Sequence, residues 1–345
     1  MKQNCYDLTI IIPMYNCEDY IDRCIESIIN QKDISVEIVL INDGSTDNSL
    51  SKVLKYCNEY ENIKLINQKN RGVSYARNIG IENANGKYIL FVDSDDYLIK
   101  DSLQSILKMA KEDYDIIRFS YVIKNKNKEQ RVIFEEMEYN TYDEKKIFIN
   151  NFLSNSYENM VWGQLIKKDL LKNVMFDEKI FYAEDFLFNY ELYEKATKIK
   201  YTSKIVYSYE KNEKSITMNF SNKKTLEKIE NLEYVFGKII NKNQELILKK
   251  QLEIKFLKEL IPQIMMLVFD KNMSKKEILE QYKNFLKQDL FIRVSKDIET
   301  EDLKKYKYLR VYKNMKKSNV KEVYNYAQIY KWLKKMQYIS YKINK

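Results

Sequence analysis

Apolar and polar positions follow two alternating patterns along the first hundred residues. Short apolar runs that end in polar residues predict buried strands, and longer segments with an apolar residue every three or four positions predict amphipathic helices. A chain in which strands and helices alternate in this way forms a doubly wound, parallel sheet. The predicted strands are 8–16, 36–43, 62–68 and 87–96, and the predicted helices are 18–30, 46–60 and 72–85.

The pattern is less regular after residue 114 and becomes helical after residue 222. The middle segment predicts strands at 114–123, 130–139 and 204–210, and helices at 143–155, 161–171 and 183–196. From residue 222 onward the spacing is helical almost throughout, with breaks at Pro262 and at 288–290. The sequence therefore predicts an α/β domain at 1–221 and a mainly helical C-terminal region at 222–345.

Polar residues gather where the predicted strands end. Parallel sheets of this kind bind ligands at the carboxyl ends of their strands. The segments PMYN (13–16), NDGSTD (42–47) and DSDD (93–96) all lie at such ends. We therefore expect a binding site at this edge of the sheet.

Composition restricts the class of protein. No apolar run in the 345 residues approaches the roughly 20 residues that span a bilayer, and the apolar run within residues 1–20 is too short, and broken by Pro13, for a signal peptide. We therefore expect a cytoplasmic protein. The cysteines lack the paired spacing of disulfides or zinc sites, so free thiols are expected at Cys5, Cys17, Cys24 and Cys57.

The chain contains no histidine. This removes the commonest catalytic base and the commonest transition-metal ligand. Proton transfer must then fall to carboxylates, Lys, Tyr or Cys. A metal site would be built from oxygen atoms, which favours Mg²⁺ or Mn²⁺ over zinc.

Three carboxylates lie within four residues after the strand predicted at 87–96, at Asp93, Asp95 and Asp96. Side by side they repel one another, which predicts a cation nearby. Asp93 and Asp95 form a D-x-D pair that could hold a divalent cation together with a diphosphate. The alternative is that these residues are solvated caps of a helix that begins near Tyr97 or Asp101.

Six segments together resemble family 2 glycosyltransferases of the GT-A fold, in the order and spacing of that family. They span about residues 8–217 and read TIIIPMYNCEDYIDRCIESI, EIVLINDGSTDNS, NRGVSYARNIGIENANGKYILFVDSDDYL, VWGQLIKKDLL, FYAEDFLFNYEL and YSYEKNEKSIT. The resemblance implies a Rossmann-like, mostly parallel sheet flanked by helices and a metal-dependent transfer from a UDP-sugar.

The resemblance also implies a role for individual residues of a nucleotide-sugar pocket. Asp43 would hydrogen-bond the uracil ring, Asp93 would face the ribose, and Asp95 with Asp93 would bind Mn²⁺ or Mg²⁺. Arg77 would contact the diphosphate. The implied pocket residues are Pro13, Tyr15, Asn16, Glu18, Asp43, Gly44, Asn70, Gly72, Arg77, Asp93, Ser94 and Trp162. For Asp43 and Asn70 the alternative is a turn-forming role.

The family uses the Asp of an E-D pair as the base, so the resemblance implies that Asp185 accepts the acceptor's proton and that Glu184 supports it, with inversion at the sugar. The pair lies at a predicted helix start, where the helix dipole keeps a carboxylate ionised. A solvated acidic first turn is the alternative. Trp162 could stack on a sugar ring or belong to the core.

The sequence departs from the family at the metal site. Many relatives complete the metal shell with a His after the E-D helix, and this chain has none. Residues 215–217 or a water molecule could fill that position, and the sequence leaves both open.

The basic charge is concentrated at the C-terminal end. Residues 303–345 contain thirteen Lys and Arg against one acid, Glu322, and so carry +12 in a chain whose formal net charge is +9. Apolar residues recur on one predicted helix face, at Val323, Tyr326, Tyr330, Leu333 and Met336. A cationic amphipathic helix suits an anionic membrane surface. The alternatives are packing on the domain or on a second subunit of a homodimer, and nucleic-acid binding, which we do not expect because no recognised module is present.

The sequence thus predicts an inverting transferase that moves a sugar from a UDP-sugar to a glycan or lipid-linked acceptor in cell-surface polysaccharide biosynthesis, cytoplasmic and peripheral at the inner face of the plasma membrane. The alternative is a non-catalytic, polyanion- or membrane-binding scaffold on a GT-A fold. The presence of Asp43, Asp93, Asp95 and Asp185 argues against that alternative.

Overall fold

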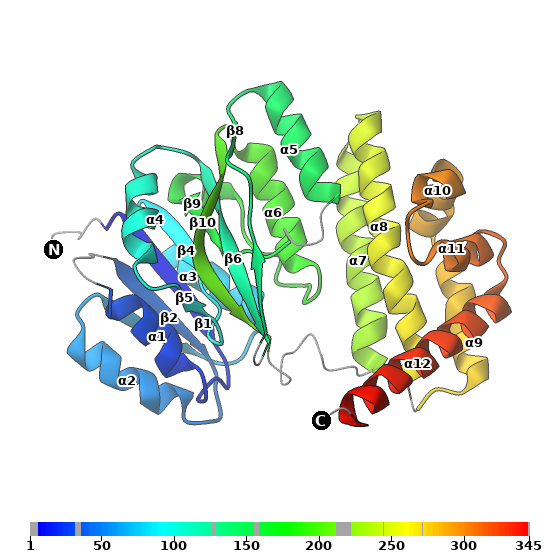
Figure 1. The fold of residues 1–345 in the computed structure, drawn as a ribbon, viewed down its shortest axis with the longest axis horizontal. Helices are drawn as coiled ribbons and strands as arrows, with labels where there is room; N and C mark the ends of the chain where they lie inside the picture. Colours follow the sequence, from blue (N-terminus) through cyan, green and yellow to red (C-terminus); the bar gives the residue numbers. More distant parts are fainter. Residues whose placement is uncertain are drawn as a thin grey trace. The chain divides into compact units, whose positions relative to one another are not determined.

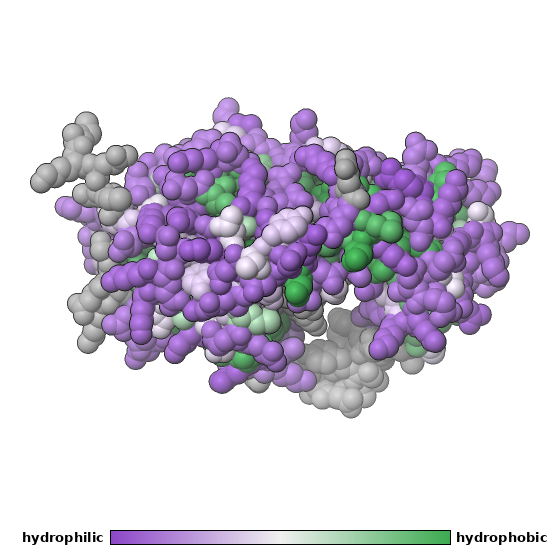
Figure 2. Space-filling view, turned by 90° about the horizontal axis from the view of Figure 1, so that it is seen from above, coloured by the Kyte–Doolittle hydropathy of each residue, from purple (hydrophilic) through white to green (hydrophobic). Residues whose placement is uncertain are grey.

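The structure is a computed structural model that describes residues 6–31, 36–125, 128–154, 159–211, 222–243, 245–270 and 272–343. The chain divides into two compact units, Met1–Ser215 and Ile216–Lys345. On the face seen in Figure 2, hydrophilic residues dominate and the hydrophobic ones form small, separate patches. In the described part of the chain, no helix combines the length and the apolar character that a membrane span requires.

The first unit is built on one mixed sheet of ten strands (Figure 1). One half is parallel, in the order β3 (Ile63–Gln68), β2 (Glu37–Asp43), β1 (Leu8–Met14), β4 (Tyr88–Phe91). The sheet continues from β4 through β9 (Gln164–Lys167), β6 (Ile116–Asn125) and β10 (Ile199–Glu210) to β5 (Tyr97–Leu98), while β7 (Lys128–Val132) pairs with β6 and β8 (Met137–Tyr139) with β10. The predicted α/β fold with a Rossmann-like sheet flanked by helices is confirmed, but the sheet, predicted to be mostly parallel, is mixed, because β5, β7, β8 and β9 pair antiparallel with their neighbours.

The order of the parallel strands places a topological switch beside β1. The chain runs outward from β1 to β2 and β3 and then returns to the other side of β1 as β4. Ligands of doubly wound sheets bind outside the carboxyl ends of the strands at such a point. The polar segments that end β1, β2 and β4 therefore share one edge.

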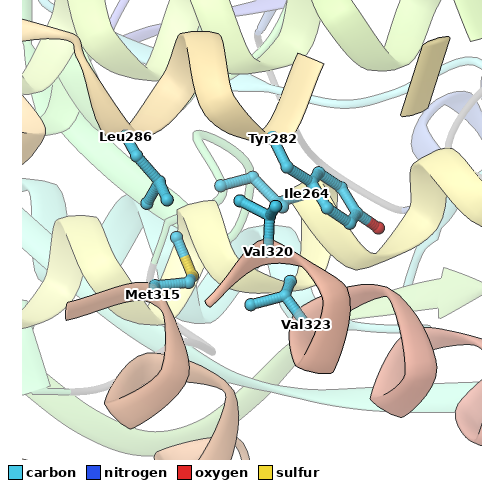
Figure 3. A pocket seen from close by; sticks show the side chains of 6 residues that line it. All are labelled: Ile264, Tyr282, Leu286, Met315, Val320 and Val323. Carbon is cyan, nitrogen blue, oxygen red and sulfur yellow. The ribbon is translucent and has the colours of Figure 1, made fainter. Parts of the chain in front are cut away.

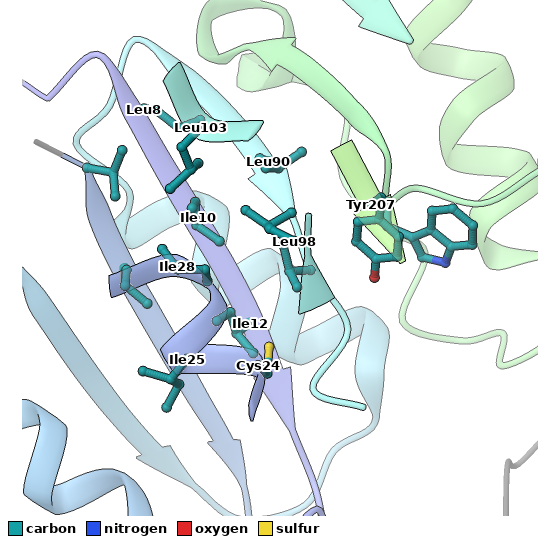
Figure 4. Packing of buried hydrophobic residues seen from close by; sticks show 14 of the residues in the cluster. Leu8, Ile10, Ile12, Cys24, Ile25, Ile28, Leu90, Leu98, Leu103 and Tyr207 are labelled. Atoms are coloured by element: carbon teal, nitrogen blue, oxygen red, sulfur yellow. The ribbon is translucent and has the colours of Figure 1, made fainter. Parts of the chain in front are cut away.

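Helices cover both faces of the sheet in the first unit (Figure 1). They are α1 (Ile21–Ile29), α2 (Ser49–Glu59), α3 (Val73–Asn83), α4 (Ser102–Ala110), α5 (Tyr142–Ser154), a 3-10 helix (Lys168–Asn173) and α6 (Glu184–Lys195). Figure 4 shows Ile10, Leu90 and Leu98 packed with Ile25 of α1 and Leu103 of α4 on one face. On the other face α3 lies so close that a Cβ on Gly80 would stand 2.4 Å from Ile11 Cγ2. All residues of β1 and β2 are buried, as expected for parallel strands covered on both sides.

All elements that the structure describes in the second unit are helical. They are α7 (Asn222–Lys242), α8 (Leu246–Met266), a 3-10 helix (Leu267–Phe269), α9 (Lys275–Leu286), α10 (Asp289–Asp297), a second 3-10 helix (Thr300–Leu303), α11 (Leu309–Lys316) and α12 (Val320–Ile343). Figure 3 shows a small apolar hollow in this unit that α8, α9, α11 and α12 enclose, with Ile264, Tyr282 and Met315 in its lining. The predicted break at 288–290 is confirmed, because α9 ends at Leu286 and α10 begins at Asp289.

The predicted break at Pro262 is wrong, since α8 continues through this residue. A proline inside a helix removes the hydrogen bond to the carbonyl four residues earlier. Here that carbonyl belongs to Lys258, and it accepts a hydrogen bond from the Tyr306 hydroxyl at 2.9 Å. A residue more than forty positions away therefore replaces the bond that Pro262 cannot make.

The helix predicted at 161–171 is also wrong. Gly163 has a φ of +68°, which a helix does not allow, and Gln164–Lys167 forms β9 between two antiparallel neighbours. Only a 3-10 helix follows it. The strand predicted at 130–139 is divided into β7 and β8, with 133–136 outside both.

Candidate functional site

Hydrogen bonds between side chains and backbone amides connect the segment after β1 with the segment after β2. Asn16, at a φ of 48°, accepts a hydrogen bond from the Thr46 amide at 2.8 Å, and its own amide donates to Ser45 Oγ. Glu18 accepts hydrogen bonds from the backbone and side chain of Asn48 at 3.0 and 2.8 Å. Asn16 and Glu18 therefore shape the rim of the site in this structure. Pro13 is buried in β1, whereas the Tyr15 side chain is 46% exposed.

Asp43, the last residue of β2, fixes the start of α3. Its carboxylate accepts hydrogen bonds from the amides of Arg71 and Gly72 and from the Gln68 side chain, each at 2.8 Å. Asp43 is almost fully buried, while Gly72 and Asn70 are exposed. Of the two expected roles for Asp43, the turn-holding one is visible in the geometry, and uracil recognition stays a prediction.

Gly44 brings the end of β2 against the same loop. It has a φ of +72°, and a Cβ at this position would lie 2.7 Å from the backbone nitrogen of Asn70. Only glycine therefore fits without moving one of the two segments. Together Asp43 and Gly44 fix residues 70–72 beside the strand ends.

The DSDD turn after β4 is braced by β10. The Tyr207 hydroxyl accepts a hydrogen bond from the Asp93 amide at 3.1 Å and donates one to Asp96 Oδ2 at 2.7 Å. Asp96 is fully buried, and its other oxygen accepts the Glu210 amide at 2.8 Å. Burial, together with the neighbouring charges of Asp93 and Asp95, raises the pKa of Asp96 well above its ordinary value.

The three acidic residues of this turn thus separate into an inner and an outer set. Asp96 points into the protein, whereas Asp93, Asp95 and the intervening Ser94 are partly exposed. Ser94 lies beside the buried thiol of Cys17. The described cysteines Cys17, Cys24 and Cys57 are free thiols, and Cys5 lies outside the described residues.

Arg77 of α3 joins the DSDD turn to the E-D pair. Its Nη1 donates to Asp185 Oδ1 at 2.7 Å, and its Nη2 donates to Asp93 Oδ1 at 3.1 Å. The guanidinium is buried and lies 5.2 Å from the centre of the Phe176 ring. Burial lowers the pKa of Arg77, but the opposing charges of Asp185 and Asp93 outweigh it, and the pKa is raised.

Glu184 and Asp185 form the first turn of α6, after Ala183 in the left-handed region at a φ of 63°. Burial, and then the charge of Asp185, raises the pKa of Glu184 to about 7. Burial also raises the pKa of Asp185, although Arg77 opposes this shift and the Val161 amide donates a hydrogen bond to the carboxylate. Carboxylates with raised pKa values at a ligand-binding edge are candidates for proton transfer near neutral pH.

Trp162 is 3% exposed and belongs to the core of the first unit. Its ring stacks on Tyr207 with centroids 4.4 Å apart and an interplanar angle of 3°, and on Tyr209 at 5.4 Å. The geometry corresponds to the core role expected for Trp162, and contact with a sugar stays a prediction.

Two residues that support the site were missed at the sequence level. The sequence predicts Tyr207 only as part of a strand, and it predicts no bracing role for Asp96. The pattern DSDD offered no means to tell its aspartates apart, because the partner of Asp96 comes 111 residues later. The predicted pocket residues otherwise surround the ends of β1, β2 and β4.

The donor set suits a hard divalent cation only in combination with a ligand. Asp93 and Asp95 contribute carboxylate oxygens, but the described residues include no group of three or more His, Cys, Asp or Glu that could hold a metal. Mg²⁺ keeps several waters and is often held by one or two carboxylates together with substrate phosphates. The two carboxylates fit such a shared site. Residues 215–217, a possible further contribution, lie outside the described residues.

Comparison with known proteins supports the resemblance. Residues 9–180 match the family model described as Glycosyl transferase family 2. The uncharacterized glycosyltransferase EpsJ of Bacillus subtilis is 34% identical over 200 residues, which are 56% of this chain and 58% of that protein. Glycosyltransferase GlyA of Streptococcus pneumoniae is 34% identical over 202 residues, 56% of this chain and 29% of that protein. The chain thus matches less than two thirds of the length of either relative.

The same fold occurs in solved structures. The crystal structure of S. aureus TarS residues 1–349 superposes with a TM-score of 0.69 at 23% identity, covering 94% of this chain and 91% of that one. Structures of the same TarS fragment with UDP and with UDP-GlcNAc give TM-scores of 0.68 and 0.67. At this identity the similarity concerns the fold.

Proposed function

The chain belongs to glycosyltransferase family 2, and we propose that it transfers a sugar from a UDP-sugar to a hydroxyl of a glycan or lipid-linked saccharide, with inversion, in the synthesis of a cell-surface polysaccharide. The UDP part of the proposal is supported by the TarS fragment, which shares the fold and was crystallised with UDP and UDP-GlcNAc. The polysaccharide part is supported by relatives such as the chondroitin synthase of Pasteurella multocida, 40% identical over 101 residues.

The observation that carries the proposal is the position of Arg77 between Asp93 and Asp185. One guanidinium bonds to both the D-x-D turn and the E-D pair, so both carboxylates lie within a few ångströms of one point. A donor diphosphate near Asp93 and Asp95 would therefore place its sugar close to Asp185. A scaffold without activity has no need for this arrangement.

Asp185 is the proposed base. The acceptor hydroxyl attacks the anomeric carbon, its proton passes to Asp185, and the bond between that carbon and the diphosphate oxygen breaks with its electrons leaving on the oxygen. A single displacement of this kind inverts the configuration. The raised pKa of Asp185 makes it a better proton acceptor than an ordinary surface aspartate.

Asp93 and Asp95 are the proposed holders of Mn²⁺ or Mg²⁺. When bound, such a cation stabilises the negative charge that develops on the departing diphosphate. A Mn²⁺ complex is known for the mannosyltransferase PcManGT of Pyrobaculum calidifontis, which shares the fold at a TM-score of 0.51. Arg77 would contribute a further positive charge beside Asp93.

The nucleoside is proposed to lie against the rim that Asp43 and Gly44 hold in place. Tyr15, Asn70 and Gly72 are exposed there and offer a ring face, an amide and a backbone that comes close. The sugar of the donor can be identified by testing the binding of a panel of nucleotide sugars.

The test is a panel of nucleotide sugars, with thermal unfolding measured with and without Mn²⁺. A ligand that binds only the folded protein raises its melting temperature. We expect a rise with UDP and one UDP-sugar that requires Mn²⁺ and is absent in Asp95→Asn. Asp185→Asn should keep the rise but lose at least about 100-fold in transfer rate, because an amide accepts no proton. A melting temperature indifferent to every UDP compound, or full transfer by Asp185→Asn, contradicts the proposal.

A further inference from the structure

Helix α12 of the second unit has two faces of different character. Val320, Val323 and Ala327 are buried where α12 packs on α8, α9, α11 and the 3-10 helix Leu267–Phe269. The face with Ile329, Trp332 and Leu333 is exposed, at 56%, 59% and 49%. These three residues are spaced as neighbours on one side of a helix. They form an apolar stripe, called here the 329–333 stripe.

This stripe differs from the one that the sequence predicted. Val323, predicted to lie on the same helix face as Leu333, is buried in the second unit, and Tyr326 and Tyr330 are partly buried. Two large apolar residues that were not expected to be on that face, Ile329 and Trp332, are exposed instead. The exposed apolar residues therefore lie at 329–333, C-terminal to the buried Val320, Val323 and Ala327.

The surroundings of the stripe are strongly cationic. Residues 303–345 carry thirteen Lys and Arg against the single acid Glu322. Exposed members of this set include Lys313, Lys317, Lys321 and Lys334. Ion pairs to acids outside this segment reach Lys304 and Lys316, through Glu301 and Glu299. The stripe thus belongs to a segment with a large excess of positive charge.

We propose that the 329–333 stripe and the lysines around it bind the surface of an anionic lipid bilayer. Apolar side chains enter the boundary between headgroups and acyl chains, Trp favours that boundary, and lysines are attracted to the negative headgroups. The helix lies on the membrane and does not cross it. A lipid-linked acceptor would be presented at the same surface, but membrane binding itself does not depend on the proposed transfer.

The charge distinguishes this partner from a second copy of the chain. A symmetric contact through the stripe would bring together two segments that each carry +12, and the like charges would repel. An anionic bilayer offers both an apolar layer for the 329–333 stripe and negative headgroups for the lysines. Nucleic acid would satisfy the charge but offers no apolar layer for Ile329 and Leu333.

The test uses the full chain and vesicles of phosphatidylcholine with and without phosphatidylglycerol. The chain has two tryptophans, and because Trp162 is already buried, a blue shift of emission on binding would report Trp332. We expect sedimentation with anionic vesicles and a blue shift, both weaker at high salt. Trp332→Phe should keep binding and remove the spectral change.

The double variant Ile329→Glu with Leu333→Glu should lower the partition coefficient at least about tenfold. The matched control is Leu246→Glu with Ile247→Glu, which makes the same change at two exposed apolar residues of the same unit and should bind nearly as the wild type does. Lys317→Ala and Lys321→Ala should each weaken binding about fivefold. All are surface changes, and equal melting temperatures confirm that the variants fold.

Three results would overturn the inference: equal binding to neutral and anionic vesicles, equal loss in the 246–247 control, or no binding while sedimentation velocity shows a dimer that Ile329→Glu disrupts. The last result would assign the stripe to a second copy. Because Asp185→Asn should bind vesicles as the wild type does, failure here can be told apart from failure of the proposed transfer.

Discussion

Arg77 lies between two carboxylates from distant parts of the chain, 2.7 Å from Asp185 and 3.1 Å from Asp93. Asp93 follows strand β4, and Asp185 begins helix α6. Because the guanidinium is buried, these charges are only weakly screened. The D-x-D turn and the E-D pair are therefore held together by the protein itself.

Replacing Arg77 by Ala should lower the free energy of unfolding by about 3 to 5 kcal/mol, because it leaves two partly buried carboxylates facing each other without a cation. Urea denaturation measures the loss. Arg71→Ala is the control: Arg71 contacts Glu178 at 3.4 Å, but it is exposed, so its loss should cost at most about 1 kcal/mol. Similar losses in the two variants would show that the Arg77 bridge contributes little.

Glu184 should make the protein less stable as the pH rises. Its pKa is raised from 4.5 to about 7 in the folded state, so the folded protein binds more protons than the unfolded chain between these values. The free energy of unfolding then falls from pH 4.5 to pH 7 and stays low above it. Glu184→Gln removes this effect and should be more stable than the wild type by up to about 3 kcal/mol at pH 8, with the difference vanishing near pH 4.

The measurement for Glu184 is urea denaturation of both proteins across that pH range. Glu194→Gln, at an exposed position near the other end of α6, is the control for the loss of a glutamate charge from this helix. A constant difference between wild type and Glu184→Gln would mean that the Glu184 carboxyl titrates alike in the folded and unfolded states.

Removing the Tyr207 hydroxyl should loosen the DSDD turn. Tyr207→Phe takes a hydrogen-bond donor from the buried Asp96 and an acceptor from the Asp93 amide, which should cost about 1 to 3 kcal/mol. The rise of melting temperature with UDP and Mn²⁺ should shrink as well. Tyr209→Phe keeps a ring that stacks on Trp162 and should leave this rise unchanged. Equal behaviour of the two variants would refute the bracing role.

Gly44→Ala should displace the loop at 70–72. The new methyl group would lie 2.7 Å from the backbone nitrogen of Asn70, and the alanine would have to adopt a φ of +72°. Together these two effects should lower the free energy of unfolding by about 2 kcal/mol or more. Nucleotide affinity should fall with it. Gly237→Ala in α7 meets only Leu290 Cδ2 at 3.9 Å and should stabilise the protein by about 0.5 to 1 kcal/mol. An unaltered UDP affinity in Gly44→Ala would separate the loop from the nucleotide site.

The sequence alone predicted those elements whose structure follows from their local hydrophobic pattern. The runs that become β1, β2 and β4 are apolar because both faces of the sheet are covered, and their polar ends indicated the edge where the candidate site is proposed. The sequence was insufficient where contacts between residues far apart in the chain determine the local structure. Gly163 and the strand neighbours on both sides of β9 override a helical spacing, and the hydroxyl of Tyr306, from the segment between the second 3-10 helix and α11, lets α8 continue through Pro262.

Side-chain direction was the second limit. Asp93 and Asp96 occur in one short motif, yet Asp96 points inward because Tyr207 and the Glu210 amide receive it. Val323 and Leu333 share a predicted face, but only the first lies where other helices cover it. Spacing along a helix gives the faces, and the neighbours in space determine which face is covered.

The hydrogen bond from Tyr306 to the Lys258 carbonyl connects the cationic end of the chain to helix α8 of the second unit. A truncation before residue 306 would remove most of the positive charge of this segment. It would also leave the Lys258 carbonyl of α8 without the hydrogen bond that Pro262 cannot donate. The segment from residue 306 onward therefore contributes to the stability of α8. Its loss by proteolysis or deletion would weaken the helix it completes, and engineered versions of the enzyme would need to retain it or replace Pro262 with a residue that restores the missing amide.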